Sequence, residues 1–223
     1  MLLSTSFNSI ILNFSNLLVN SGNQSKADFF DAQADASWAA SEYTNEERAK
    51  IEQVLDCLPE LQGCTVLEPG CGTGRLTQIL TDKVGPEGLV LALDISPKMI
   101  ASAKSRLHGL NNVDLACVPL EGVSLPDAAV DLIFCHQVFP HFDQKKTVIS
   151  LMNKWLRPGG KLVVFHLINI EEINDLHRKS GTAVAEDIMP TREEMRSLFH
   201  SAELEIECLD DQSDRYFLLA SKV

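Results

Sequence analysis

This sequence of 223 residues lacks several features that would direct its interpretation elsewhere. Its six cysteines form neither a Cys-x-x-Cys pair nor another ligand-like cluster, which argues against a structural metal site and a disulfide framework. Basic residues are few, 19 against 31 acidic ones, and the net charge of −12 would repel nucleic acid and anionic membranes. We therefore predict a cytoplasmic protein with reduced, mostly packed thiols, no metal, and no nucleic-acid or membrane partner. A small molecule is the expected partner.

Charged side chains are absent from residues 1–25, whose apolar residues nevertheless recur at steps of three and four. These are Leu3, Phe7, Ile10, Ile11, Phe14, Leu17 and Leu18. The segment has no basic start, no arginine and no run of about 20 apolar residues, so it does not fit a secretory signal, a transit peptide or a membrane span. The pattern predicts an amphipathic helix that packs on the domain or forms a homodimer contact. A poorly ordered extension is the alternative.

The chain length and the 45% hydrophobic content favour one globular domain with an appendage. We place an N-terminal helical extension or lid at residues 1–44 and the main domain at residues 45–223. Within the extension, four aromatic residues follow a polar linker at Ser21–Lys26: Phe29, Phe30, Trp38 and Tyr43. No internal repeat or low-complexity tract is present.

The stretch Val66–Thr77 combines an apolar run, an acid and three alternate glycines ahead of a helical pattern. The run ends at Glu68, and the glycines are Gly70, Gly72 and Gly74. Glycine permits backbone conformations that are closed to other residues, and it lets a ligand approach bare N–H groups beside the positive end of a helix. A carboxylate at the mouth of the loop suits a cationic ligand group better than a pyrophosphate. The stretch therefore predicts a nucleotide-type pocket.

A second carboxylate, Asp94, ends the apolar strand that starts at Leu89, 20 residues past the last glycine. An acid at this position can accept hydrogen bonds from both ribose hydroxyls of a ligand. Ser96 and Pro97 then begin a helix, with Met99 on its first turn, where an adenine ring would lie. Met99 could equally be a plain core residue.

Strands alternate with helices along the chain, which predicts an α/β fold with a parallel sheet and ligands at the carboxyl ends of its strands. The expected strands end at residues 68, 94, 118, 136 and 166, and a hairpin of residues 204–209 and 216–220 closes the sheet. The expected helices are 44–59, which begins with a capping box, 73–83, one from residue 97, 143–155, 171–179 and 191–201. Asp143 is expected to cap its helix, the glycines of Arg157–Gly160 to end it, and residues 181–190 to form a loop.

Two phrases of the sequence resemble a known family. Val66–Gly74 resembles the first motif of class I S-adenosylmethionine-dependent methyltransferases, and Leu156–Val164 resembles a later stretch of the same family. The match covers roughly residues 45–223. The resemblance implies a Rossmann-like, seven-stranded, mostly parallel sheet with an antiparallel C-terminal hairpin and helices on both faces. It also implies transfer of a methyl group from S-adenosylmethionine to a small-molecule acceptor, with release of S-adenosylhomocysteine.

The resemblance further implies a set of cofactor-binding residues. In that family the acid and the glycine loop hold the amino-acid end of the cofactor, and an acid further along the chain lies near the adenine. The expected set is Glu68, Gly70, Cys71, Gly72, Gly74, Asp94, Ile95, Met99, Glu121 and His136. We interpret Cys71 as a small residue that fills the turn rather than as a nucleophile.

Four of the six histidines follow the fourth or fifth expected strand: His136, His141, His166 and His177. These strands are neighbours in the resembled topology and face the methyl end of the cofactor. We select His141 and His166 as catalytic candidates, because one of them could act as a general base on the acceptor. His177 reads as a surface residue, and His136 could contribute only its backbone. A metal site formed by His141, His166 and His177 is the weaker alternative, since their spacing repeats no known ligand pattern.

The aromatic segment ahead of the main domain has two interpretations. In the resembled family this segment often closes over the cofactor or the substrate. Alternatively, Phe29, Phe30 and Trp38 simply staple the first helix of the domain to the sheet.

Two other functions stay open. A nicotinamide-dependent oxidoreductase could use the same kind of sheet, but the Gly-x-Gly-x-x-Gly spacing is absent. The Tyr-x-x-x-Lys pair of such enzymes is absent too, because the only tyrosines are Tyr43 and Tyr216. The second alternative is a non-catalytic regulatory module that keeps the cofactor site without turnover.

Overall fold

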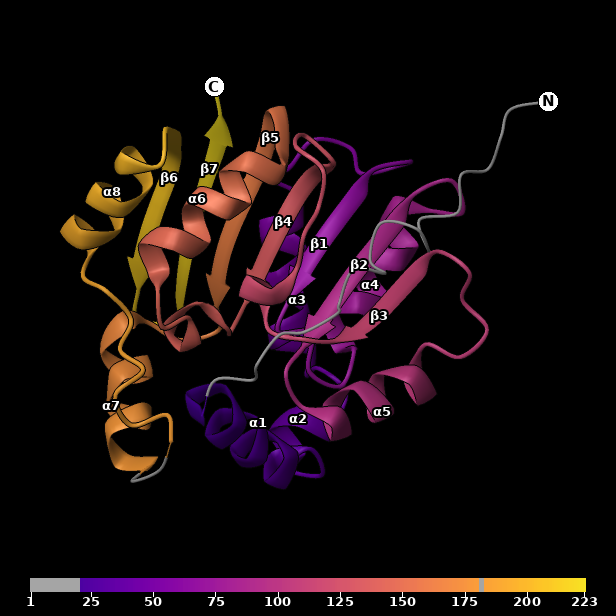
Figure 1. Cartoon of the computed structure of the whole chain (residues 1–223), viewed down its shortest axis with the longest axis vertical. Coiled ribbons are helices and arrows are strands. Elements are labelled where there is room, and N and C mark those ends of the chain that lie inside the picture. The colour runs from indigo at the N-terminus through magenta and orange to yellow at the C-terminus, as the bar shows by residue number, and fades with distance from the viewer. Residues whose placement is uncertain (1–20, 181–182) are drawn as a thin grey trace.

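The chain forms a seven-stranded sheet in the order β3-β2-β1-β4-β5-β7-β6 (Figure 1). The computed structural model describes residues 21–180 and 183–223. The strands are β1 (Thr65–Pro69), β2 (Leu89–Asp94), β3 (Val113–Cys117), β4 (Val130–His136), β5 (Leu156–His166), β6 (Leu204–Gln212) and β7 (Arg215–Lys222). Strands β1 to β5 pair in parallel, whereas β7 is antiparallel to both β5 and β6. The predicted α/β sheet with an antiparallel C-terminal hairpin is therefore confirmed.

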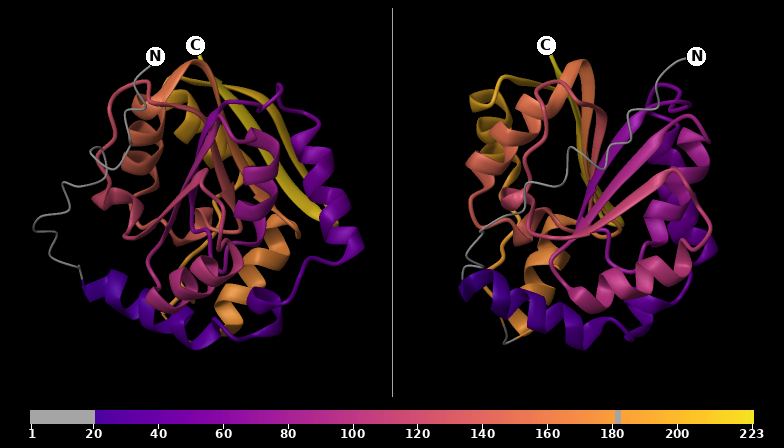
Figure 2. Two further views of the ribbon diagram at one scale, coloured as in Figure 1. Left: turned by 90° about the vertical axis from the view of Figure 1, so that its right-hand side faces the viewer. Right: turned by 45° about the vertical axis from the view of Figure 1, so that its right-hand side comes forward.

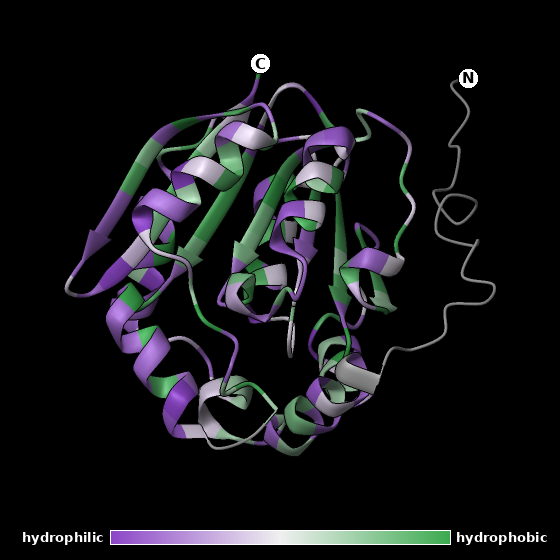
Figure 3. Ribbon diagram, turned by 60° about the vertical axis from the view of Figure 1, so that its left-hand side comes forward, coloured by the Kyte–Doolittle hydropathy of each residue, from purple (hydrophilic) through white to green (hydrophobic). Residues whose placement is uncertain are grey.

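Helices cover both faces of the sheet, because successive strand residues point to opposite sides. One face is covered by α3 (Asn45–Leu55), α4 (Arg75–Val84) and α5 (Pro97–Arg106). The other face is covered by α6 (Lys145–Trp155) and α8 (Arg192–Ser201). Val66 and Leu67 are neighbours in β1, yet they belong to these two separate apolar clusters. Figure 3 shows the hydrophobic strands in green between helices that carry many hydrophilic residues.

Three further helices lie beyond the carboxyl ends of the parallel strands (Figure 1): α1 (Ser21–Gln33), α2 (Ser37–Ala40) and α7 (Ile170–Ser180). Helix α1 runs against α5 (Figure 2). Two single-turn 3₁₀ helices follow β3 and β4 along the chain: η2 (Leu120–Gly122) and η3 (Phe139–His141). Because ligands of open parallel sheets bind at the carboxyl edge, these segments are placed to surround a site there.

Two predicted capping boxes are present, Thr44 with Glu47 at α3 and Thr191 with Glu194 at α8. In each box the threonine side chain accepts a hydrogen bond from the glutamate N–H, and the glutamate carboxylate accepts one from the threonine N–H. Helix α3 ends at Leu55, a few residues before its predicted limit.

The linker predicted at Ser21–Lys26 is wrong, because these residues are the start of α1. Gln24 donates a hydrogen bond to Asp28 one turn later at 2.8 Å, and Lys26 and Ala27 are buried. Packing against the domain thus overrides the low helix propensity of serine, glycine and asparagine. The predicted amphipathic helix of residues 1–25, with its homodimer contact, falls mainly on residues 1–20, which lie outside the described residues.

Two predictions around α6 are also wrong. Asp143 does not cap this helix, which begins at Lys145 without a side-chain cap. The Asp143 carboxylate instead accepts a hydrogen bond from Lys26 Nζ at 2.5 Å. The helix ends at Trp155, ahead of Arg157–Gly160, which lies within β5 where its register with β4 shifts. The glycines therefore serve an irregular strand pair rather than the end of a helix.

The C-terminal hairpin is longer than predicted, because β6 and β7 leave only Ser213 and Asp214 between them. Residues 183–190 contain no helix or strand, in agreement with the predicted loop. Of the helices that the structure describes, none combines the length and the apolar character needed to cross a membrane.

All six cysteines are free thiols. Cys71 and Cys135 are buried, whereas Cys57 and Cys117 are exposed. The prediction of mostly packed thiols is therefore wrong for the exposed pair.

Candidate functional site

A pocket with a volume of about 1040 Å³, including its open mouth, lies at the carboxyl ends of β1, β2 and β4. The strand order reverses between β1 and β4, and such a reversal is where ligands of open α/β sheets bind. The glycine loop after β1 forms one wall, and residues of α1, α2 and η3 form the opposite side. Segments far apart in the sequence thus meet at one site.

The glycine loop takes backbone conformations that favour glycine, with φ of +70° at Gly70, +55° at Gly72 and +83° at Gly74. A Cβ atom on Gly70 would lie 2.4 Å from Cγ2 of Val138, so no larger residue fits against the loop after β4. Gly74 does not line the pocket. It is the N-cap of α4, and its α-carbon faces the side chain of Ala103 in α5.

Glu68 is the most unusual group of the pocket. Its side chain is 2% exposed at the end of β1, and its Oε2 atom has no hydrogen-bond partner among the described residues. Burial raises the pKa of Glu68 to about 8; a hydrogen bond with Thr77 opposes the shift, and the nearby Asp94 carboxylate adds to it. A buried carboxylate without a partner is costly, so this oxygen is suited to accept a hydrogen bond from a cationic ligand group.

Asp94 ends β2 and ties two loops together. One carboxylate oxygen accepts the N–H of Gly72 and the other accepts the N–H of Ser96, both at 2.8 Å. Burial raises the pKa of Asp94, and these backbone donors partly offset the shift. Each oxygen has a second lone pair, so the carboxylate can still accept hydrogen bonds from ligand hydroxyls.

Four other predicted cofactor residues line the same pocket: Cys71, Ile95, Met99 and Glu121. Met99 is buried on the first turn of α5, and Glu121 is exposed on η2. Burial, together with two nearby carboxylates, raises the pKa of the Cys71 thiol well above its usual range. Cys71 is therefore an unreactive residue that fills the turn.

The segment between α1 and α3 covers the glycine loop. Phe30, Trp38 and Tyr43 all line the pocket, so these aromatics do more than staple a helix to the sheet. Thr73 of the loop donates a hydrogen bond from its hydroxyl to the Ala39 carbonyl. Arg75 donates one to the Ser41 carbonyl at 3.2 Å and lies 4.1 Å above the Tyr43 ring.

Two side chains, Asp31 and Arg106, join α5 and the residue before it to α1, to the segment that follows α1 and to the glycine loop. Asp31 of α1 accepts hydrogen bonds from the Ser96 hydroxyl and, at 3.0 Å, from the Lys98 N–H. Arg106 donates to the carbonyls of Thr73 and Ala40, each at 3.1 Å. The cover is therefore fixed to the glycine loop and to α5 by side-chain hydrogen bonds.

His136, at the end of β4, lines the pocket as a neutral ring. Neither ring nitrogen has a hydrogen-bond partner among the described residues. The ring stacks on Phe165 with centroids 5.3 Å apart and meets the Tyr43 ring edge at 5.9 Å. Burial, with the nearby Arg75 cation, lowers the pKa of His136 to about 3. The side chain, and not only the backbone, thus reaches the pocket.

His141 also lines the pocket, and it carries a carboxylate partner. Its Nδ1 atom lies 2.8 Å from Oδ2 of Asp187. Burial lowers the pKa of His141 more strongly than the hydrogen bond to Asp187 raises it. Its ring meets Phe30 of α1 edge-on, with centroids 5.0 Å apart.

His166 does not line this pocket. It is buried beside Tyr216, with ring centroids 6.4 Å apart, and its Nε2 has no hydrogen-bond partner among the described residues. The catalytic role expected for His166 therefore loses its geometric support. No cluster of histidine, cysteine and carboxylate side chains within residues 21–180 and 183–223 could hold a metal ion.

Sequence reasoning missed two pocket-side residues, Lys26 and Asp187. Lys26 falls in the predicted linker, and none of its neighbours in the sequence indicates an ion pair. Its Nζ atom nevertheless lies 2.9 Å from Oδ1 of Asp187, a residue far along the chain. Asp187 lies in the predicted loop, between Val184 and Met189, which are both buried. An acid among such apolar residues is the signal that could have identified it.

A profile of the methyltransferase domain family matches residues 60–214. The chain belongs to the class I S-adenosylmethionine-dependent methyltransferases. Its cofactor is S-adenosylmethionine, which decides against the nicotinamide-dependent alternative. The residues of the pocket fit this cofactor. The unpartnered oxygen of Glu68 suits its ammonium group, and Gly70 and Gly72 leave bare backbone beside that oxygen.

Two curated relatives show the extent of the similarity for this methyltransferase. The malonyl-[acyl-carrier protein] O-methyltransferase of Priestia megaterium is 37% identical over 124 residues, covering 54% of this chain and 44% of the relative. The trans-aconitate 2-methyltransferase of Methylobacterium nodulans is 30% identical over 142 residues, covering 61% and 52%. The chain thus spans about half the length of the curated relatives it matches.

A solved structure extends the likeness of the fold to nearly the whole chain. The geranyl diphosphate C-methyltransferase of Streptomyces coelicolor A3(2) superposes with a TM-score of 0.73, covering 92% of this chain and 99% of that one. Its sequence is only 12% identical, so this likeness concerns the fold alone.

Proposed function

We propose that this methyltransferase methylates a small-molecule acceptor, which binds between α1, α2 and the loop after β4. The observation that carries this proposal is the cover over the pocket. Phe30, Trp38 and Tyr43 line the same cavity as the glycine loop, so the acceptor shares an enclosed space with the cofactor. The pocket is lined by aromatic and aliphatic side chains with a few polar groups among them, which is typical of small-molecule sites.

On this proposal, the cofactor residues divide by position. Glu68 accepts a hydrogen bond from the ammonium group, and Asp94 accepts hydrogen bonds from the ribose hydroxyls while it holds the N–H of Gly72. Met99 and Glu121 serve the adenine end. Bound S-adenosylmethionine supplies an electrophilic methyl group on a sulfonium.

His141 is the proposed general base. Its lowered pKa keeps the ring neutral near pH 7, so a ring nitrogen can take the proton of an acceptor hydroxyl, amine or thiol. His136 is neutral as well, and its unpartnered ring nitrogens can hydrogen-bond the acceptor. Phe142 lines the same wall and helps to exclude water.

We propose further that the acceptor is uncharged where it enters the pocket. Lys26 and Arg75 are the only lysine or arginine side chains among the described lining residues. Lys26 is already paired with Asp143 and Asp187, and Arg75 is held by the Ser41 carbonyl. A carboxylate acceptor would therefore lack a free cation as a partner and would pay a desolvation cost.

An acceptor screen tests the proposal through release of S-adenosylhomocysteine. Neutral phenols, amines and thiols should give turnover, whereas trans-aconitate, a malonyl-loaded acyl carrier protein and transfer RNA should give none. Turnover of the carrier protein or the nucleic acid in preference to all free compounds would overturn the small-molecule acceptor. Preference for trans-aconitate over every neutral compound would overturn only the uncharged acceptor.

Once an acceptor is known, His141→Ala should lower kcat by roughly 10²- to 10⁴-fold, the usual contribution of a general base. The affinity for S-adenosylhomocysteine should stay within about twofold, because His141 is not among the proposed cofactor ligands. His108→Ala is the matched control, since His108 is exposed beyond α5 and outside the pocket. Unchanged kcat in the His141 variant would remove it from the reaction.

A further inference from the structure

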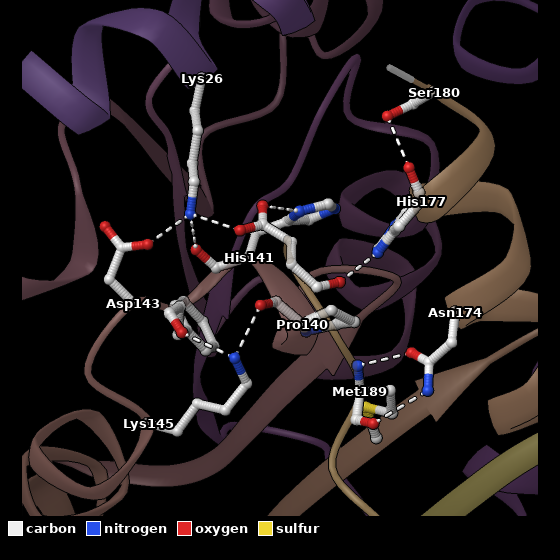
Figure 4. A network of polar contacts seen from close by, with 11 residues as sticks. Lys26, Pro140, His141, Asp143, Lys145, Asn174, His177, Ser180 and Met189 are labelled. Carbon is white, nitrogen blue, oxygen red and sulfur yellow. Dashed lines mark hydrogen bonds and ion pairs between the residues drawn. The ribbon is translucent and has the colours of Figure 1, made fainter. Parts of the chain in front are cut away.

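A network of charged groups joins α1 to the wall of the pocket that carries His141 (Figure 4). Lys26 of α1 is only 6% exposed, although lysine is rarely buried. Its Nζ donates to Oδ1 of Asp143 at 2.5 Å, to the His141 carbonyl at 2.8 Å, and lies 2.9 Å from Oδ1 of Asp187. All three donor positions of the ammonium group are therefore used.

Asp187 stands at the centre of this network. One carboxylate oxygen faces Lys26 Nζ and the other faces Nδ1 of His141. The backbone carbonyl of the same residue is hydrogen-bonded to the His177 ring of α7. Burial alone would raise the pKa of Asp187, but the hydrogen bonds from His141 and Lys26 bring it below its ordinary value.

An ionised Asp187 determines which nitrogen of His141 carries the proton. A carboxylate can only accept, so Nδ1 must be the donor, and Nε2 then keeps its lone pair. Free imidazole has no such constraint. The Nε2 lone pair is the one that a base on the pocket wall needs.

We propose that Asp187 is a positioning residue that fixes His141 as the Nδ1–H tautomer, and that Lys26 holds Asp187 in place, so that docking of α1 assembles the base. This proposal rests on the proposed function in one respect, the acceptor whose proton His141 would take. Helix α1 then has two roles: it covers the pocket, and through Lys26 and Asp187 it orients His141, the proposed base.

The charge environment of His141 fixes the direction of each expected change. Other titratable or charged groups face this ring or its partner from every neighbouring element: Lys26 on α1, Asp143 after η3, Lys145 on α6, His166 on β5, His177 on α7 and Asp187 ahead of α8. Asp187 raises the pKa of His141, whereas Lys26 and His177 lower it. Removing Asp187 should therefore lower this pKa, and removing Lys26 should raise it.

The decisive measurement is the ¹⁵N spectrum of the histidine rings in the full chain saturated with S-adenosylhomocysteine, with His141→Gln used to assign the signal. Wild-type His141 should be the Nδ1–H tautomer at pH 7. Asp187→Asn should move it toward the Nε2–H tautomer and lower its pKa. Lys26→Met should cause a smaller loss of the Nδ1–H tautomer and raise the pKa.

Two control variants match these changes away from the pocket. Lys50 also bridges a helix to a distant loop, with Nζ 2.9 Å from the Asp214 carbonyl and 3.2 Å from Glu46. Asp131 accepts from the Thr65 N–H at 2.8 Å at the other end of the sheet. Lys50→Met and Asp131→Asn should leave the His141 tautomer and pKa as in the wild type.

The outcomes separate the parts of the proposal. A wild-type Nε2–H tautomer overturns it without any variant having to fold. Retention of the Nδ1–H tautomer in Asp187→Asn overturns the role of Asp187, and an unchanged spectrum in Lys26→Met overturns the role of α1. A general loosening would move the His141 pKa toward about 6.5 in both variants, so a rise in Asp187→Asn also counts against positioning.

The kinetics of the Asp187 variant provide a second test, because loss of a merely structural residue would not shift the pH profile of the rate. Asp187→Asn should lower kcat at least tenfold with little change in KM, and the acid limb of its pH profile should move to lower pH. An unaltered profile would refute the positioning role. Failure to find any acceptor would count against the proposed function and leave the tautomer measurement as the test of this inference.

Discussion

Two buried carboxylates have opposite environments: Glu68, which lines the pocket, and Asp187, which contacts the pocket residue His141. Glu68 has an oxygen without a partner, and burial raises its pKa to about 8. Asp187 has a lysine and a histidine as partners, which together lower its pKa. Both are nearly inaccessible, so burial alone does not explain the difference. The pocket leaves an acceptor oxygen open to a ligand at Glu68, whereas the carboxylate of Asp187 already has its partners.

The difference shows how one cavity can serve binding and chemistry separately. At Glu68 the unmet hydrogen bond costs stability in the free protein and is recovered when a cation binds. At Asp187 the chain supplies the cation itself, from α1, so the histidine keeps its orientation before any ligand arrives.

Glu68→Gln should have the largest effect on cofactor binding. The change removes a charged hydrogen bond worth about 1.5 to 3 kcal/mol, so calorimetry should show roughly 10- to 150-fold weaker binding of S-adenosylhomocysteine. The melting temperature of the free protein should rise, because a buried carboxylate without a partner is removed. Asp187→Asn should instead lower it.

The two variants should shift the melting temperature in opposite directions, and this difference is the most discriminating result. Equal destabilisation by both variants would mean that Glu68 has a partner in the free protein and that the contrast is false. The exposed Glu203→Gln, remote from the pocket, is a suitable control for the charge change alone.

Asp94→Ala should weaken binding of S-adenosylhomocysteine by at least tenfold, since it removes a charged acceptor. The structure adds a cost to the free protein, because the N–H groups of Gly72 and Ser96 lose their partner. Thermal melting should therefore fall together with affinity, unlike the result for Glu68. Wild-type affinity would show that the ribose binds elsewhere.

The pH dependence of stability gives the smallest effect. The folded pKa of Glu68 is raised from its ordinary 4.5 to about 8, so its stabilising contribution is complete below pH 4.5 and is lost as the pH rises through 8. The folded pKa of Asp187 lies below its ordinary 3.8, so its contribution is present above that value and is lost as the pH falls through the folded pKa.

Melting curves between pH 5 and pH 8.5 check this. The free wild-type protein should lose stability across the range, and Glu68→Gln should lose less. Parallel curves for the two proteins would refute the raised pKa of Glu68.

The meeting of Glu68, the glycine loop and Asp94 at one pocket was predictable from the sequence because it depends on local signals. Glu68 and the glycines follow an apolar strand directly, and Asp94 ends the next one, so topology alone brings them to one edge. The C-terminal hairpin was predictable from the residue pattern of its two strands, and the seven-stranded, mostly parallel sheet from the resemblance to the family. Most of the site there lies within a few residues of a strand end.

The other side could not be predicted for a physical reason. The place of His141 after β4 predicts its position, but its proposed role depends on Asp187, in an irregular segment, and on Lys26, in a helix of low propensity. No periodic pattern connects these residues, because their contacts are purely tertiary. His166 has an equally suitable place after β5, yet its side chain packs beside Tyr216. A strand end fixes where the backbone goes, not where the side chain points.

The cover also provides an optical signal. The chain has two tryptophans. Trp155 is buried at the end of α6, whereas Trp38 is 49% exposed and lines the pocket beside the glycine loop. Binding of a ligand should therefore change the emission of Trp38 over a constant background from Trp155. Stopped-flow fluorescence of the unlabelled protein can then time the arrival of cofactor and the release of product.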